Sequence, residues 1–141
     1  MRDSSYQVKF DQRGNFIHAM VTGPNTAETV IRYMDEIKQE CDRRDCYRVL
    51  IEEKLDGPRF DEMEIFSLID NQSSAALGFF DALAYVDEQQ QFELAKFAET
   101  VAVNRGIPIA VFSSLPDAEN WLRHRGDGAD EKGIFTGDGR D

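Results

Sequence analysis

The hydrophobic pattern near the start of the chain predicts a β-hairpin followed by a helix. Residues 6–10 and 16–21 are two runs typical of strands, and a polar turn with a glycine lies between them. Apolar residues then recur at helical spacing over residues 27–41. Asn25, with Glu28 three residues later, is the capping pair expected to open this helix.

Three short apolar runs farther along the chain, 49–51, 82–86 and 109–112, predict buried, adjacent parallel strands. Helical patterns lie between and after these runs. Two of the helices have capping pairs at their starts: Asp61 with Glu64, and Ser114 with Asp117. The resulting order, ββαβαβαβα, predicts an α/β protein with a mostly parallel, five-stranded open sheet and an N-terminal hairpin that adds an antiparallel edge strand.

The length of 141 residues fits one domain with a single core. We expect this domain to span residues 1–123, because no linker or internal repeat interrupts them. Residues 124–141 contain five of the ten glycines and few large apolar residues, which predicts a flexible C-terminal tail.

Charge and composition narrow the classes of function. The chain has 27 acidic and 16 basic residues, and the formal net charge of -11 disfavours binding to nucleic acid. No apolar run approaches the ~20 residues of a membrane span, and no secretory signal opens the sequence, so we expect a cytoplasmic protein without membrane insertion. The two cysteines, Cys41 and Cys46, are expected to be free thiols there.

The element order and spacing resemble the STAS domain (sulfate transporter and anti-sigma factor antagonist), and more closely its bacterial SpoIIAA-like relatives. That fold is shared with CRAL-TRIO lipid-binding domains. The resemblance covers about residues 6–123, and five segments carry it: 23–26, 49–57, 82–86, 109–112 and 117–122. It implies a non-enzymatic, regulatory domain that acts through contact with a protein partner, and a homodimer is compatible with it.

Anti-sigma factor antagonists of this family are switched by phosphorylation of a Ser or Thr near the start of the helix that follows the third strand. Residues 52–65 contain neither Ser nor Thr, so this switch is not carried over to the chain. Acidic Asp56 and Asp61 are instead expected to shape the local turn and helix start.

The sequence contains no recognisable catalytic or metal-binding motif. His18 and His124 are far apart, and neither lies near a cysteine at a metal-ligand spacing. Ser113 and Ser114 lack the glycines of a nucleophile elbow. We therefore expect no enzyme activity, no metal and no cofactor, although the acidic stretch 52–64 leaves an enzymatic site as a weaker alternative.

Partners of open parallel sheets usually meet the loops beyond the carboxyl ends of the strands. The expected partner or ligand rim consists of Asn25, Thr26, Glu53, Lys54, Asp56, Arg59, Asp87, Glu88 and Ser113. Arg59 is its sharpest candidate, because a guanidinium can bind a partner carboxylate through two parallel hydrogen bonds. Phe79 and Phe80 are adjacent after a glycine and predict an exposed apolar contact.

Two functions follow from these observations. The first is regulation through protein contact at the rim. The alternative is a carrier that holds a small molecule or lipid in an apolar cavity between the sheet and the helices, because the middle of the chain is rich in aromatic residues.

Overall fold

The computed structural model describes residues 6–57, 60–76, 78–87 and 92–125 of the chain. Within these ranges, one five-stranded sheet carries four helices, so the protein has an α/β fold. The elements in chain order are β1 (Gln7–Arg13), β2 (Phe16–Pro24), α1 (Ala27–Arg44), β3 (Arg48–Asp56), α2 (Glu62–Ala76), β4 (Ala82–Asp87), α3 (Phe92–Asn104), β5 (Ile109–Phe112) and α4 (Leu115–Arg125).

The strands lie in the sheet in the same order as in the chain, β1-β2-β3-β4-β5. β1 pairs antiparallel with β2, whereas β2 with β3, β3 with β4, and β4 with β5 pair in parallel. The sheet is therefore mixed, which corrects the expectation of a mostly parallel sheet, because the tight turn of the hairpin sends β1 and β2 in opposite directions. The prediction that the runs 49–51, 82–86 and 109–112 form adjacent parallel strands is confirmed.

A two-residue turn at Gly14 and Asn15 closes the hairpin, since Arg13 lies opposite Phe16. Gly14 has a φ of 65°, a left-handed conformation that glycine adopts without a steric penalty. The Gln12 amide nitrogen donates to the carbonyl oxygens of Gly14 and Phe16 at 3.0 and 3.3 Å, which ties the side chain across the turn.

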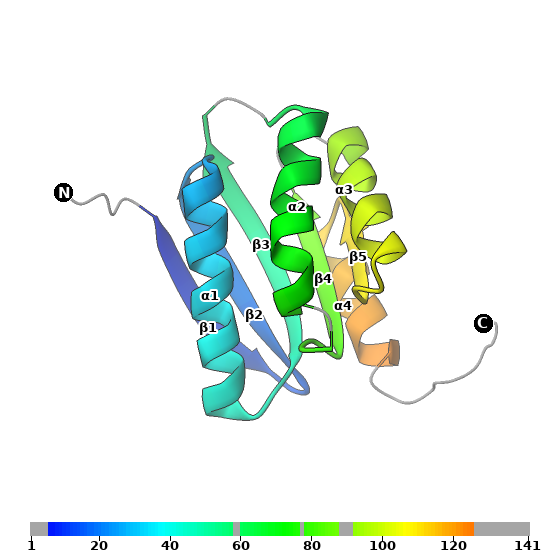
Figure 1. Cartoon of the computed structure of the whole chain (residues 1–141). Helices are drawn as coiled ribbons and strands as arrows, with labels where there is room; N and C mark the ends of the chain where they lie inside the picture. Colours follow the sequence, from blue (N-terminus) through cyan, green and yellow to red (C-terminus); the bar gives the residue numbers. More distant parts are fainter. Residues whose placement is uncertain (1–5, 58–59, 77, 88–91, 126–141) are drawn as a thin grey trace.

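The two faces of the sheet are covered to different extents (Figure 1). α1, α2 and α3 lie side by side on one face, which we call the three-helix face, and α4 lies on the opposite face, which we call the α4 face. Alternate residues of β3 supply both sides: Ile51 belongs to the core under the three helices, and Leu50 packs with Leu122 of α4. Burial on both faces explains why the central strands read as unbroken apolar runs.

The predicted caps of α2 and α4 are confirmed. The Glu64 N–H donates to Oδ1 of Asp61 at 2.8 Å, and the Asp61 N–H donates to Oε1 of Glu64 at 2.9 Å, which forms a reciprocal capping box. At α4, the Asp117 N–H donates to Oγ of Ser114 at 3.4 Å. These bonds satisfy amides that have no partner within the first turn of a helix.

The start of α1 differs from the prediction by one residue. Thr26 is the N-cap, and its hydroxyl accepts from the N–H of Thr29 at 3.1 Å. Asn25, the expected cap, instead donates its N–H to the carbonyl oxygen of Asp56 at 2.6 Å. This bond lies one residue beyond the last pair of β2 and β3, Pro24 opposite Asp56, and α1 begins two residues later, at Ala27.

Phe80 is buried in the core, with 4% of its surface exposed, so the prediction of an exposed aromatic pair is wrong at this position. Its ring packs edge-on against Phe79 with a centroid separation of 5.0 Å, and Phe79 packs edge-on against Tyr47 at 5.2 Å. These neighbouring rings give both phenylalanines apolar partners within the chain, which removes the need for an outside contact.

The last helix continues past the predicted domain end at residue 123. α4 runs to Arg125, and Nδ1 of His124 lies 2.8 Å from the carbonyl oxygen of Asn120, so the start of the predicted tail is helical. The rest of that tail, 126–141, lies outside the described residues. No described helix combines the length and the apolar character that a bilayer crossing requires.

The side chain of Glu99 contacts the backbone of β5, which is an edge strand of the sheet. Oε2 of Glu99, on α3, accepts a hydrogen bond from the N–H of Val111 at 2.8 Å. Lys96 forms an ion pair with the same carboxylate at 2.5 Å, one helical turn earlier. The contact ties α3 to β5 by a polar bond in addition to apolar packing.

We expect Leu122→Ala to lower the free energy of unfolding by about 2–5 kcal/mol, because a buried leucine is replaced by a cavity. Leu122 is 0% exposed and anchors α4 to the sheet. Val103→Ala, at a 50% exposed position on α3, is the control and should change the stability by less than about 0.5 kcal/mol. Chemical denaturation of the three proteins measures both values, and equal stability of Leu122→Ala and wild type would contradict the packing described for α4.

Candidate functional site

A cavity of about 180 Å³ lies between the three-helix face of the sheet and helices α1, α2 and α3. Strands β3, β4 and β5 form its floor, and side chains of the three helices form its walls. Most of its lining is apolar and includes Met34, Ile51, Leu68, Leu83, Ala98 and Ile107. Native cores are usually packed without voids of this size, so the cavity is the first candidate for a binding site.

The polar end of the cavity lies toward the carboxyl ends of the strands. Glu53 of β3 pairs in register with Asp87 of β4, and both line the cavity. Tyr85 lies two residues before Asp87 on the same strand, and Tyr33 reaches the site from α1. Two carboxylates and two phenols therefore meet where the floor of the cavity changes from apolar to polar.

Both tyrosines donate their hydroxyl protons to the same carboxylate. The Tyr33 hydroxyl donates to Oε2 of Glu53 at 2.5 Å, and the Tyr85 hydroxyl donates to Oε1. Glu53 is half-buried and lines the cavity. We call Tyr33, Glu53, Tyr85 and Asp87 the tyrosine–carboxylate cluster.

Burial sets the protonation chemistry of this cluster. Burial, followed by the nearby Glu53 carboxylate, raises the pKa of Tyr33 and Tyr85 well above the usual value, so both hydroxyls keep their protons near neutral pH. Burial also raises the pKa of Glu53, whereas the hydrogen bonds from the two tyrosines oppose this effect. The charge of Asp87 adds to the upward shift, because two like charges on neighbouring strands repel each other.

The alternation of β3 explains why Glu53 points into the cavity although Glu52 precedes it. Ile51 and Leu55 are core residues of the three-helix face, so Glu53, midway between them, has the same orientation. Glu52 points to the α4 face, where Oε1 lies 2.9 Å from Nε2 of His18. The two adjacent glutamates thus belong to two different sites.

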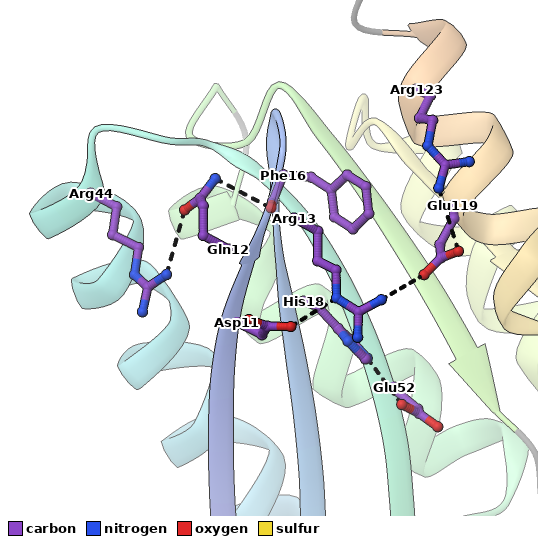
Figure 2. Close-up of polar contacts among 9 residues, drawn as sticks. All are labelled: Asp11, Gln12, Arg13, Phe16, His18, Arg44, Glu52, Glu119 and Arg123. Carbon is purple, nitrogen blue, oxygen red and sulfur yellow. Dashed lines mark hydrogen bonds and ion pairs between the residues drawn. The ribbon is translucent and has the colours of Figure 1, made fainter.

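The second polar cluster lies on the α4 face and connects the hairpin with α4 (Figure 2). Arg13 donates to Asp11 at 2.8 Å and to Glu119 of α4 at 3.2 Å. His18 and Glu52 are buried beneath this layer, with 9% and 4% of their surfaces exposed. We call this set the hairpin–α4 network; its members are Asp11, Arg13, His18, Glu52, Glu119 and Arg123.

The network is better explained as a structural connection than as a binding site. Each of its charged groups has a partner of opposite charge, including Arg123 with Glu119 at 3.6 Å and Lys54 with Glu52 at 3.4 Å. The cavity described above lies on the other face of the sheet. His18 and Glu52 are hydrogen-bonded to each other at 2.9 Å, so removing either side chain would leave a buried polar partner unsatisfied.

The predicted rim is divided between several environments. Glu53 and Asp87 line the cavity with Asn25, whereas Thr26 caps α1. Lys54 and Asp56 are exposed at the end of β3, and Ser113 is exposed after β5. Arg59 and Glu88 lie outside the described residues. The structure thus brings Asn25, Glu53 and Asp87 together around one cavity and leaves the other described rim residues on the surface.

The remaining candidates do not form a reactive centre. Cys41 is buried, and burial raises the pKa of its thiol to about 12, so it carries no thiolate near neutral pH. Within the described ranges, no group of three or more His, Cys, Asp or Glu side chains is arranged to hold a metal ion. The cavity therefore remains the feature with the clearest chemical character.

Sequence reasoning missed the two tyrosines of the cluster. Tyr33 lies on the buried stripe of α1 and was indistinguishable from a core aromatic residue, and Tyr85 lies within an apolar run. A signal for Glu53 was present, because the alternation of Val49, Ile51 and Leu55 with their neighbours places residue 53 on the core face.

Sequence comparison with known proteins does not assign the chain to a family. No protein-family model matches it, and no curated protein has a significant sequence match to it. The interpretation of the cavity depends on its geometry and chemistry.

We expect Glu53→Gln to become more stable relative to wild type as the pH rises through and above the usual range of a glutamate carboxyl. A raised pKa in the folded state means that the unfolded chain loses this proton first, so ionisation of Glu53 lowers the free energy of unfolding at higher pH. Glutamine has the same shape and does not ionise. Denaturant unfolding at several pH values measures the trend; Glu28→Gln, at an exposed position, is the control. Parallel pH profiles of Glu53→Gln and wild type would contradict this assignment.

Proposed function

We propose that the protein binds a small, largely apolar molecule in the cavity between its sheet and α1, α2 and α3. The observation that carries this proposal is the cavity itself, with about 180 Å³ of space and a mostly apolar lining. An engineered apolar cavity of about 150 Å³ in another protein binds benzene. The space here suits one ring, or a short branched chain, with a substituent of one or two heavy atoms.

The energetic cost of the space supports a role in binding. Unfilled apolar space leaves the side chains that line it without packing contacts on one side, which is unfavourable. Larger side chains at Ala95, Ala98 or Ala102, which line the cavity from α3, would fill it. A ligand that occupies the cavity recovers contacts that these small residues leave unmade.

The resemblance to STAS and CRAL-TRIO domains supports the same proposal from another direction. We propose that the fold is STAS-like, since an N-terminal hairpin precedes three strand–helix units in both, and that the protein is cytoplasmic. Among the relatives that this resemblance suggests are lipid-binding domains, which hold apolar ligands. The carrier function considered as the alternative from the sequence is therefore the one that the geometry favours.

Regulation through contact with another protein is the second candidate function. One observation favours it: α2 presents large apolar side chains to solvent near its start, with Met63 73% and Phe66 42% exposed. This part of α2 follows the loop at the carboxyl end of β3, close to the surface part of the predicted rim. The two functions are compatible, because a ligand held under α2 can change the position of that helix.

Native mass spectrometry of protein purified from its own host separates these candidates. We expect an added mass of a small organic molecule, which solvent extraction removes. A stoichiometric complex with a second protein, without any small molecule, would favour the regulatory function over the carrier function.

The direct test of the carrier proposal uses toluene as a probe, because its size matches the cavity. We expect saturable binding with a Kd of about 1 mM, followed by shifts in the backbone amide signals of residues 94–102 in nuclear magnetic resonance titrations. Ala98→Leu fills part of the cavity and should weaken toluene binding by about tenfold or more. Ala27→Leu, at an exposed position of α1, is the matched control and should bind as wild type does. Equal binding by both variants would remove the cavity as the site.

A further inference from the structure

We propose that the ligand of the cavity is an amine: a small apolar ring or short chain that carries a protonated amino group, with the nitrogen bound at the tyrosine–carboxylate cluster. This inference rests on the proposed function and specifies its ligand class. The inference is supported by the apolar lining of the cavity together with its polar end, which has hydrogen-bond acceptors but few available donors.

The hydrogen-bond inventory of the cluster leads to this chemistry. Tyr33 and Tyr85 each have one hydroxyl proton, and both protons are donated to Glu53. The remaining valences are lone pairs on the two phenol oxygens and on the Glu53 carboxylate. A ligand that meets this end of the cavity must therefore supply donors. An ammonium group has three donors and no acceptor, so it can donate to the lone pairs of the two phenol oxygens and of the Glu53 carboxylate.

The charge of the lining residues also favours a cationic ligand. The residues described as lining the cavity include two carboxylates, Glu53 and Asp87, and no Lys, Arg or His. The other polar side chains in this lining are the amides of Asn25 and Gln72, which can donate or accept. Glu53 is hydrogen-bonded to two neutral phenols, and its carboxylate attracts a cation and repels a carboxylate or phosphate ligand. Hydrogen bonds between an ammonium and a carboxylate are also stronger than those between neutral groups.

The size of the cavity restricts the apolar part of the ligand. About 180 Å³ holds a benzene-sized ring with one or two further heavy atoms, and benzylamine has this composition. The apolar lining residues Leu68, Leu83 and Ile107 would contact the ring, while the amino group lies toward Glu53.

A purely structural role for Glu53 makes a different prediction. If its carboxylate served only to tie Tyr33 of α1 to Tyr85 of β4, its replacement would change stability and would not distinguish one probe from another. Glu53→Gln separates the two roles, because the glutamine oxygen can accept from one tyrosine and its amide group can donate to the other. The variant thus retains the connection between α1 and β4 and removes the charge.

The test compares three probes of similar size, namely toluene, benzylamine and benzoate, on wild type, Glu53→Gln and the control Glu28→Gln. Glu28 is an exposed residue of α1 outside the cavity lining, so its replacement corrects for the general attraction of an acidic protein to amines. Titrations followed by nuclear magnetic resonance near neutral pH give the Kd of each probe for each protein. Asp87→Asn serves as a second cluster variant if Glu53→Gln folds poorly.

We expect wild type to bind benzylamine about tenfold or more tightly than toluene and to bind benzoate more weakly than either. Glu53→Gln should lose about tenfold or more in benzylamine affinity and should change by less than about twofold for toluene. Glu28→Gln should match wild type for all three probes. Toluene binding with no preference for benzylamine, or a preference unchanged in Glu53→Gln, would overturn the amine assignment and leave the carrier function standing. Failure of all probes to bind would overturn both.

Discussion

The parallel pairing of β3 with β4 is the constraint on which the rest of the structure depends. Its register places Glu53 opposite Asp87 on the three-helix face, with Ile51 opposite Tyr85 one step earlier. The same register places Leu50 opposite Ala84 on the other face, where the small alanine lets α4 approach the sheet closely. A shift by one residue would turn one of the two strands over relative to the other, so that Glu53 and Asp87 would no longer share a face and that strand would lose its core contacts. One strand pairing therefore determines both the core of the protein and the polar end of its cavity.

The architecture could be predicted from the sequence wherever one local rule decided the outcome. The apolar runs 82–86 and 109–112 had to enter the sheet, although the edge strand β5 is mostly half-buried, and the reciprocal pair of Asp61 and Glu64 had a single plausible role at a helix start. Local rules failed where a tertiary contact competed with them. Asn25 is a good cap by its chemistry, yet its N–H is engaged by the carbonyl oxygen of Asp56, and Thr26 caps the helix instead.

The cavity could not be predicted, because it is a property of distances between elements and not of residue order. Ala98 and Ala102 have the spacing of an ordinary helix stripe, and the sequence does not state how far α3 stands from the sheet. Tyr33 has the same ambiguity, since a buried tyrosine needs a partner for its hydroxyl but the partner lies on a strand twenty residues away. The alternation of side chains along β3 was enough to predict the face on which Glu53 lies. Its hydrogen-bond partners could be identified only from the structure.

The contact between Glu99 and Val111 has a consequence for how the protein behaves at high concentration. β5 is an edge strand of four residues, and an edge strand with free amides is a template for pairing with another chain. The Glu99 carboxylate accepts from one of these amides, and its ion pair with Lys96 places charged groups beside the strand. At the opposite edge, Lys9, Asp11 and Arg13 alternate along β1 and oppose flat stacking of a second sheet. Charged side chains at both borders of the sheet therefore oppose the pairing of an edge strand with a second molecule.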